Sequence, residues 1–402
     1  MEKKRLFFIT TLLPYPFFCG NQVRMFNIIK SLSRKFDITL VSQVSSDKDL
    51  IYVDKFNEYC KDICVILAKN KKSSLHKYFY KIKYWLYFFF KDIPKDMFYA
   101  NYCGLQKVAM QLLKTNRFDI CFFEYWFWPE LLDWAEGLKV VDTNDVQYQR
   151  CEQLGKCSKR RLENYRHQEI STLNKYDVII TVTEKDKQIL GKNLDKNKIL
   201  IVPTGVNTHY YIPLEKNLLS ENIISFYGGM SSQTNIDALF YFYRDIFPLI
   251  KKEVRNARLL IVGSNPPQEV LNLAKQNDDI TVTGYVQDVR DYLRMSKVSV
   301  CPMLVGFGIR GRVLEIISMG IPVVVTKASV DGMQLKEGHG ILIRNTITDF
   351  AQAVINLLQN TSMAKEIGNL GRDFVLANCS YESTYDHLTE LLYSNCTVNS
   401  LS

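Results

Sequence analysis

The sequence predicts an α/β protein built from two doubly wound domains in series. Short apolar runs alternate with amphipathic stretches along the whole chain, which is typical of βαβ units and parallel sheets. This pattern pauses at a Pro-Thr-Gly at residues 203–205 and then restarts, and 402 residues is a length typical of two domains. We therefore expect domains at residues 1–205 and 206–380, with a last helix in 381–402 that packs back on the first domain.

Seven strands are predicted in the first domain. Each is a short apolar run, as expected for a strand buried on both faces of a parallel sheet. Amphipathic stretches at residues 24–35, 103–115 and 159–174 predict helices between them. The predicted strands are residues 6–10, 38–42, 63–67, 119–123, 140–142, 178–182 and 199–202.

Six strands are predicted in the second domain, separated by helices. Ligands of such sheets bind beyond the carboxyl ends of the strands, so we expect a site there, in the cleft between the domains. The predicted strands are residues 223–227, 259–262, 280–283, 298–301, 323–326 and 341–343. The predicted helices are residues 234–251, 268–276, 289–295, 310–319, 349–359, 362–377 and 381–393.

The basic excess of the chain is confined to its first half. Residues 1–205 hold 34 Lys and Arg against 23 Asp and Glu, whereas residues 206–402 hold 17 against 19. Residues 69–95 contain eight Lys and one acid, interleaved with aromatic residues. This composition predicts either contact with an anionic membrane surface or a solvated face over a packed helix. No recognised nucleic-acid-binding module is present, and we expect no nucleic-acid partner.

The chain is expected to be cytoplasmic. The longest apolar run of the basic segment, residues 84–90, has seven residues, whereas a transmembrane helix needs about 20. The N-terminus begins like a signal peptide, but its apolar stretch reaches Pro14 without a cleavage site, and we interpret it as a strand. Ten Cys are scattered without a CxxC pair, which is typical of reduced thiols.

The segment 301–326 holds the most informative motif. A buried strand is followed by a loop with glycines at 306, 308 and 311, and a helix begins near Arg310. Glycines let a backbone approach a ligand, and free amides at a helix N-terminus attract phosphate. Arg310 and Arg312 can add forked hydrogen bonds to phosphate oxygens, and ligand hydroxyls would satisfy Glu315 among its apolar neighbours. The alternative is a plain strand-to-helix turn with solvated arginines.

This motif resembles the donor-binding motif of retaining GT-B glycosyltransferases, carbohydrate-active family 4 (glycosyl transferases group 1), in the exopolysaccharide-type form Gly-Ile-x-x-Lys/Arg-Val-Leu-Glu. The resemblance is dense over residues 223–343 and thin over 43–118. It implies the GT-B fold, in which two Rossmann-like domains face each other across a cleft. Its further matches are residues 13–16 with Gly20 and Arg24, 178–184, 201–207, 226–230 with Asn235, 260–264, and 283–286 with Asp288.

The resemblance also implies roles for single residues. Glu315 would bind the ribose of a nucleotide-sugar donor, while Arg312 and Arg310 would hold its diphosphate as the catalytic cations. The resemblance implies no metal site and no cofactor, because arginines and a helix N-terminus take the place of Mg²⁺ and the nucleotide sugar is a substrate. The other donor-binding residues would be Phe307, Gly308, Ile309, Gly311, Gly228 and Gly229, with Tyr285 and Val286 at the base and Gly20 from the first domain.

Several positions depart from the pattern of the family that the chain resembles. The first of its two glutamates, which contacts the donor sugar, falls on Phe307, and its basic pair after the first donor-domain strand falls on Gly229 and Thr234. A His near the reacting carbon falls on Asn144. Beside it, Asp145, our catalytic candidate in this domain, or Asp142 would orient an acceptor hydroxyl, or both would cap the following turn.

Together these features predict a retaining, hexosyltransferase-like enzyme of surface polysaccharide or exopolysaccharide biosynthesis. It would move a sugar from a nucleotide-sugar donor to a lipid-linked or saccharide acceptor, at the inner face of the cell membrane. Cations at the leaving diphosphate would stabilise the transition state more than the ground state. The departures leave two alternatives, a catalytically impaired GT-B partner subunit and a GT-B nucleotide-sugar epimerase.

Overall fold

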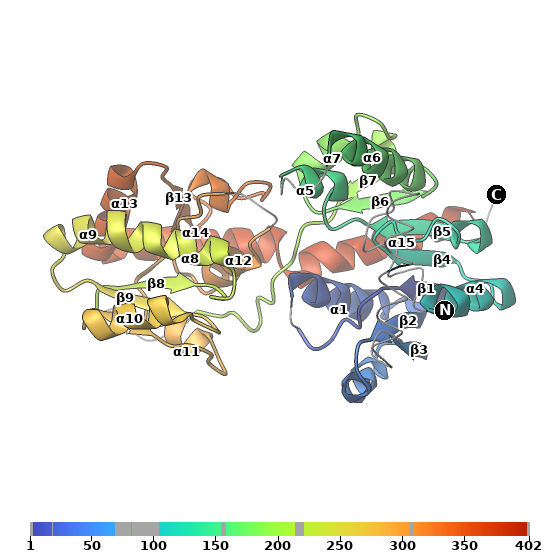
Figure 1. Cartoon of the computed structure of the whole chain (residues 1–402), viewed down its shortest axis with the longest axis horizontal. Helices are drawn as coiled ribbons and strands as arrows, with labels where there is room; N and C mark the ends of the chain where they lie inside the picture. Colours follow the sequence, from blue (N-terminus) through green and yellow to red (C-terminus); the bar gives the residue numbers. More distant parts are fainter. Residues whose placement is uncertain are drawn as a thin grey trace. The chain divides into compact units, whose positions relative to one another are not determined.

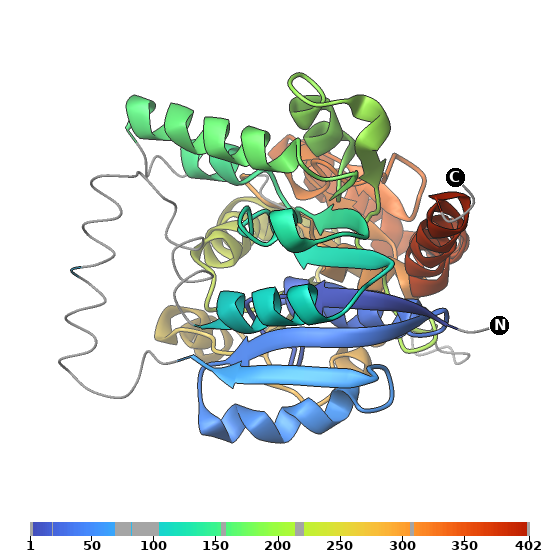
Figure 2. The same ribbon diagram turned by 90° about the vertical axis from the view of Figure 1, so that its right-hand side faces the viewer.

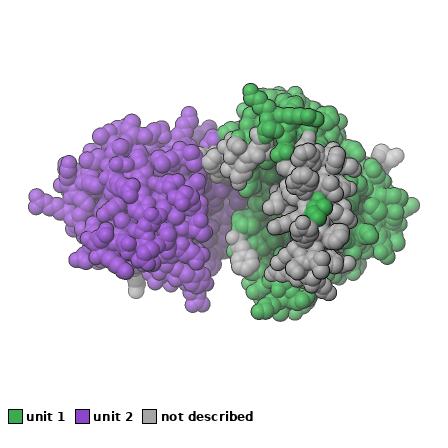
Figure 3. All heavy atoms as spheres, in the orientation of Figure 1, with its two compact units in different colours: residues 1–203, 385–402 green, residues 204–384 purple. Residues whose placement is uncertain are grey.

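The computed structural model describes residues 3–17, 19–68, 82, 104–153, 158–213, 221–305 and 309–399. The chain divides into two compact units, Met1–Pro203 with Tyr385–Ser402, and Thr204–Thr384 (Figure 3). Each contains one parallel sheet with helices packed around it (Figures 1 and 2). The predicted α/β class with two Rossmann-like sheets is confirmed. The basic aromatic segment 69–95 lies outside the described residues, except for position 82.

The sheet of the first unit has seven parallel strands in the order β3-β2-β1-β4-β5-β6-β7. Every predicted strand of this half is present, and β4 and β6 are buried along their whole length because both faces of the sheet are covered. The strands are β1 (Lys4–Ile9), β2 (Phe36–Val44), β3 (Asp62–Leu67), β4 (Ile120–Glu124), β5 (Leu138–Asp142), β6 (Val178–Thr181) and β7 (Ile199–Ile201).

The helices of the first unit include the last helix of the chain. Helix α15 is joined to α1 and the residues after it, because the Ser31 and Thr389 hydroxyls share a hydrogen bond at 2.7 Å and Lys35 Nζ donates to Glu390 Oε2 at 2.6 Å. The described helices are α1 (Gly20–Leu32), η1 (Asp47–Phe56), α4 (Leu105–Thr115), η3 (Leu132–Trp134), α5 (Gln147–Gln153), α6 (Lys159–Leu173), α7 (Glu184–Leu190), η4 (Lys196–Lys198) and α15 (His387–Asn399).

The second unit has six parallel strands in the order β10-β9-β8-β11-β12-β13. The strands are β8 (Ile223–Tyr227), β9 (Arg258–Val262), β10 (Ile280–Val282), β11 (Val298–Cys301), β12 (Val323–Val325) and β13 (Ile341–Ile343). Its helices are α8 (Gln233–Tyr241), η5 (Phe242–Ile246), α9 (Phe247–Glu253), α10 (Gln268–Gln276), α11 (Arg290–Leu293), α12 (Gly311–Ser318), η6 (Lys327–Ser329), α13 (Ile347–Gln359) and α14 (Thr361–Asn378), and η7 (Glu382–Asp386) begins in this unit and ends in the first.

Two predicted helices need correction, and some short helices were not predicted. The single helix expected over 234–251 is α8 and α9 joined by the π-helical segment η5. The helix expected over 381–393 begins later, at His387, after the π-helical turn η7. Helix η1 was not predicted because its ten residues lack an apolar stripe; the Ser46 side chain caps it by accepting from the Lys48 amide.

The strand order places one switch point in each sheet. It lies between β1 and β4 in the first unit and between β8 and β11 in the second. Chain connections leave the sheet in opposite directions on the two sides of such a point, and the opening at the carboxyl ends of the strands is where ligands bind. The segments that follow β1, β4, β8 and β11 are therefore the places to look for a site.

Candidate functional site

The two predicted phosphate-binding arginines lie at the start of α12, which follows β11. Arg310 is the residue before the helix, and its side chain does not cap the first turn. Its Nη2 donates to the Val305 carbonyl at 2.9 Å, while its Nε is buried without a partner among the described residues. Burial lowers the pKa of Arg310, so an anion would find a poorly solvated cation there.

Arg312 is the second residue of α12 and reaches across the switch point to the turn after β8. Its Nη2 donates to Asn235 Oδ1 at 2.9 Å, and the Asn235 amide donates in turn to the Gly229 carbonyl at 2.8 Å. The guanidinium also lies against Gly228, where a Cβ atom would be only 2.1 Å from Nη1. The structure therefore places the Arg312 guanidinium beside Gly228 and Gly229.

Glu315 lies one turn further along α12, between two tyrosines. Tyr227, at the end of β8, and Tyr211 both interact with its carboxyl through their hydroxyls, but Oε2 has no partner within the described part of the chain. Burial raises the pKa of Glu315, although both tyrosines and Arg312 act against this. The unpaired oxygen could accept a hydrogen bond from a ligand hydroxyl.

Tyr285 and Val286 follow β10 and lie at a second part of the same sheet edge. The Tyr285 side chain is 79% exposed, whereas Val286 packs against the core. They line an open groove of about 680 Å³ together with Tyr210 and Tyr292. A flat aromatic ring in such a groove can stack on a planar ligand. Gly306, Phe307 and Gly308 lie outside the described residues. Gly311 is the first residue of α12, and Ile309 lies two positions before it.

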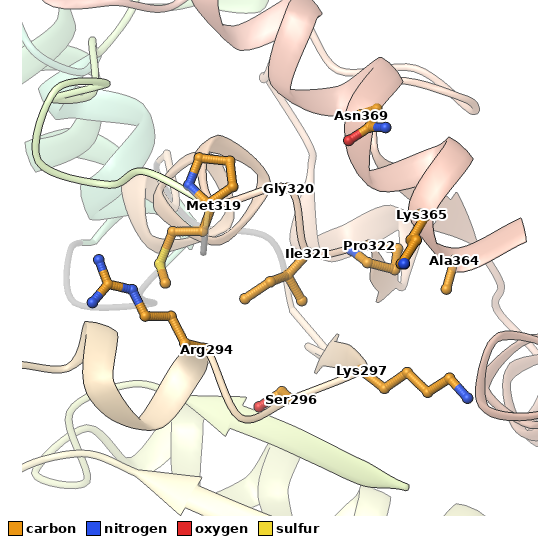
Figure 4. A pocket seen from close by; sticks show the side chains of 11 residues that line it. Arg294, Ser296, Lys297, Met319, Gly320, Ile321, Pro322, Ala364, Lys365 and Asn369 are labelled. Atoms are coloured by element: carbon orange, nitrogen blue, oxygen red, sulfur yellow. The ribbon is translucent and has the colours of Figure 1, made fainter. Parts of the chain in front are cut away.

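A better enclosed cavity lies at the opposite edge of this sheet. Its volume is about 240 Å³, and its lining includes Arg294, Lys297 and Lys365 (Figure 4). Lys297 directly precedes β11, so this cavity faces the amino ends of the strands. The Lys297 amine points away from the Arg294 guanidinium and donates to the Leu358 carbonyl at the end of α13. The cations of this cavity do not converge on one ligand.

In the first unit, the predicted acceptor residues differ in how they are paired. Asp142, the last residue of β5, is 0% exposed and accepts from Arg24 at 2.8 and 3.2 Å. Asp145 accepts from Gln147 and from Arg150, and burial raises its pKa to about 6. Asp142 is thus committed to a buried ion pair, whereas Asp145 is partly exposed. Gly20 is the first residue of α1, and a Cβ there would meet nothing within 4 Å.

One acidic residue of this edge escaped the sequence analysis. Glu124 ends β4 directly beside Asp142, and its side chain accepts from Asn144 at 2.5 Å. Its other oxygen has no described partner. Burial and the neighbouring Asp142 raise the pKa of Glu124, so this carboxyl keeps its proton to a higher pH than an exposed glutamate does. Tyr125 and Asn144 both have positive φ, at 60° and 55°, which places strained backbone beside it.

Two family models match the chain, one after the other. The model described as "Glycosyltransferase Family 4" matches residues 20–210, and the one described as "Glycosyl transferases group 1" matches residues 221–360. Together they match most of both units. The chain belongs to the GT-B glycosyltransferases.

Solved structures share this GT-B fold over nearly the whole chain. Sucrose-phosphate synthase from Thermosynechococcus elongatus is 14% identical, with a TM-score of 0.67 over 98% of this chain and 100% of that one. Anabaena Alr3699/HepE, in complex with UDP and glucose, is 10% identical, with a TM-score of 0.63 over 97% of this chain and 100% of that one. At such identities the likeness concerns the fold.

A relative by sequence covers a smaller part of the chain. An "uncharacterized 44.6 kDa protein in cps region" of Klebsiella pneumoniae is 22% identical over 200 residues, which are 48% of this chain. The alignment spans 52% of that relative, about half its length.

Among the described residues of this GT-B chain, no helix is both long and apolar enough to cross a membrane.

Proposed function

We propose that this GT-B protein transfers a sugar from a nucleotide-sugar donor to a saccharide or lipid-linked acceptor, with retention of the anomeric configuration. The observation that carries the proposal is the group formed by Arg312, Glu315 and the glycine turn after β8, at the switch point of the second sheet. A guanidinium and a helix N-terminus suit a diphosphate, and a carboxyl with an unpaired oxygen suits a ribose hydroxyl. The HepE complex with UDP and glucose supports a donor of this class.

In this proposal the arginines act mainly in the transition state. When the bond between the sugar and the diphosphate breaks, negative charge grows on the leaving diphosphate. A guanidinium that is already in place stabilises that charge without reorganising. The leaving phosphate oxygen would accept the proton of the acceptor hydroxyl on the same face of the sugar, so no protein nucleophile is required and the configuration is retained.

The proposed pathway is surface polysaccharide biosynthesis at the inner face of the membrane. The exopolysaccharide-type form of the motif, Ile309 to Glu315, supports it, and so does the cps-region relative. The basic segment 69–95 would provide the contact with anionic lipid. Flotation with liposomes, with and without anionic lipid, tests this part, because equal recovery in both would remove the membrane contact.

The experiment for the donor is a panel of UDP-, GDP- and ADP-sugars, assayed for hydrolysis and for binding by calorimetry. We expect one donor to be turned over slowly with water, and both Arg312→Ala and Glu315→Ala to abolish this turnover. Binding without any turnover would favour a catalytically impaired partner subunit. An epimerised nucleotide sugar as product would favour an epimerase, and neither binding nor turnover with any donor would refute the proposal.

A further inference from the structure

We infer that Asn235 is a positioning residue that places the Arg312 guanidinium over a neutral turn, so that Arg312 supplies the positive charge this turn lacks. The inference rests on the proposed function, in which the site binds a nucleoside diphosphate. It gives Asn235 a role in the site, and it explains how Arg312 of α12 can also act at the turn after β8.

The turn after β8 contributes no charge of its own. Residues 228–235 read Gly-Gly-Met-Ser-Ser-Gln-Thr-Asn, without a single ionisable side chain. The turn is nevertheless held firmly, because the Gly228 amide donates to the Val262 carbonyl at 3.0 Å and the Met230 amide donates to the Ser264 carbonyl at 2.9 Å. Its amides and the start of α8 offer only partial positive charge to a ligand.

Arg312 approaches this turn from a segment 77 positions away. The contact requires Gly228, since any side chain there would overlap Nη1. Asn235 is 7% exposed, and its amide group is oriented by its bond to Gly229, which leaves Oδ1 to accept from Arg312. Met303 Sδ lies 3.3 Å from the same Nη2. The hydrogen-bond partners of the guanidinium are thus neutral, and the carboxyl that acts on it electrostatically is that of Glu315, which burial favours in its protonated form.

A neutral amide is the right partner for this task. A carboxylate at position 235 would hold the guanidinium equally well, but it would cancel the charge that a diphosphate needs. A residue without a polar group would leave the Arg312 side chain flexible. Ligand binding would then have to order this side chain, and the loss of conformational entropy would weaken the affinity. Asn235 avoids both problems. Substitutions of this residue can therefore distinguish the effect of holding the Arg312 guanidinium in place from the effect of a charge beside it.

The test measures binding of UDP, GDP and ADP to the full chain by calorimetry, with the corresponding monophosphates for comparison. Losing one hydrogen bond to a charged group should weaken diphosphate binding about tenfold in Asn235→Ala. Asn235→Asp should bind more weakly still at low salt, and the gap between the two variants should narrow at high salt. Monophosphate binding should change less. Gln352→Ala, at an exposed position of α13 outside the site, is the control and should bind as wild type does.

A relocated charge provides a second test that a purely structural role would not pass. A Cβ at Gly229 meets nothing within 4 Å, and its φ is not positive, so the turn can carry a side chain there. In the Arg312→Ala background, Gly229→Arg should recover about tenfold of the lost diphosphate affinity, since it returns a charge-assisted bond.

The outcomes are distinct. If the wild-type chain binds a diphosphate and both Asn235 variants bind it as tightly as the wild-type chain does, the inference is wrong. The same holds if Asn235→Asp binds as tightly as Asn235→Ala at low salt. If the wild-type chain binds none of the diphosphates, the proposed function itself fails, and the role of Asn235 falls with it.

Discussion

Asp142→Asn should destabilise the first unit strongly, because it leaves the Arg24 cation buried without its counter-charge. The pair is fully enclosed, with side chains 2% and 0% exposed, and Arg24 Nε lies 2.8 Å from Oδ2. Arg24 also donates to the Pro203 carbonyl at 3.1 Å and lies over the Tyr385 ring. The ion pair therefore connects α1 and β5 with Pro203, where the first chain segment of this unit ends, and with Tyr385, where the second segment begins.

Removing one partner of a buried ion pair typically costs about 3–5 kcal/mol, because the remaining charge cannot be solvated. For a urea dependence of roughly 2 kcal/mol per M, this lowers the unfolding midpoint by roughly 1.5–2.5 M. Replacing both partners by apolar residues, in Arg24→Met with Asp142→Leu, should cost less than the sum of the two single changes. The expected coupling is about 2 kcal/mol or more.

Tryptophan fluorescence makes the measurement specific for the first unit. All four Trp of the chain lie within residues 1–203, and Trp126 and Trp128 are fully buried there. A urea midpoint of Asp142→Asn close to that of wild type, or additive single changes, would refute the structural role. Loss of sugar transfer with an unchanged midpoint would instead return Asp142 to the acceptor-binding role that the sequence left open.

Two further predictions concern pH and packing. Glu169 accepts from the amides of Gln147 and Tyr148, yet burial raises its pKa to about 8 from 4.5. The folded state then holds this proton more tightly than the unfolded state, so stability should fall as the pH rises from about 4.5 to about 8, by up to about 1.4 kcal/mol per pH unit. Glu169→Gln should flatten this dependence in fluorescence-monitored urea unfolding at several pH values, and an unchanged slope would contradict the assignment. Gly368→Ala should destabilise the second unit by about 1–3 kcal/mol, because its Cβ would lie 2.0 Å from the Gly320 carbonyl oxygen. Calorimetry should show the loss, whereas the exposed Asn369→Ala should change stability by less than about 0.5 kcal/mol; equal transitions would argue against the clash.

The fold was largely predictable because its signals are local. Each of the strands is a compact apolar run, and parallel sheets bury such runs on both faces, so both sheets follow from the pattern of short segments. The exceptions are helices whose ends depend on distant packing. The π-helical segment η5 interrupts a continuous amphipathic stretch, and no periodicity marks it.

The candidate site was predictable only where it is contiguous in the chain. Arg312 and Glu315 lie three positions apart on α12, so the sequence indicated that they are neighbours, while their roles toward a donor came from the family resemblance and stay predictions. Tyr227, Tyr211 and Glu124 come from other strands and loops, and their proximity depends on strand order. The sequence also could not separate Asp142 from Asp145, since the difference is the partner Arg24, 118 positions away.

The two units use an arginine at the switch point in opposite ways. In the first unit Arg24 meets a carboxylate, and the pair is buried, so its charges cancel and its contribution is structural. In the second unit Arg312 meets the amide of Asn235, which orients the guanidinium without neutralising it. A neutral acceptor keeps a fixed cation available, because a carboxylate in the same place would compete with the anionic ligand. The nature of the partner, more than the presence of the arginine, therefore supports the proposal that the second switch point is the one that binds an anion.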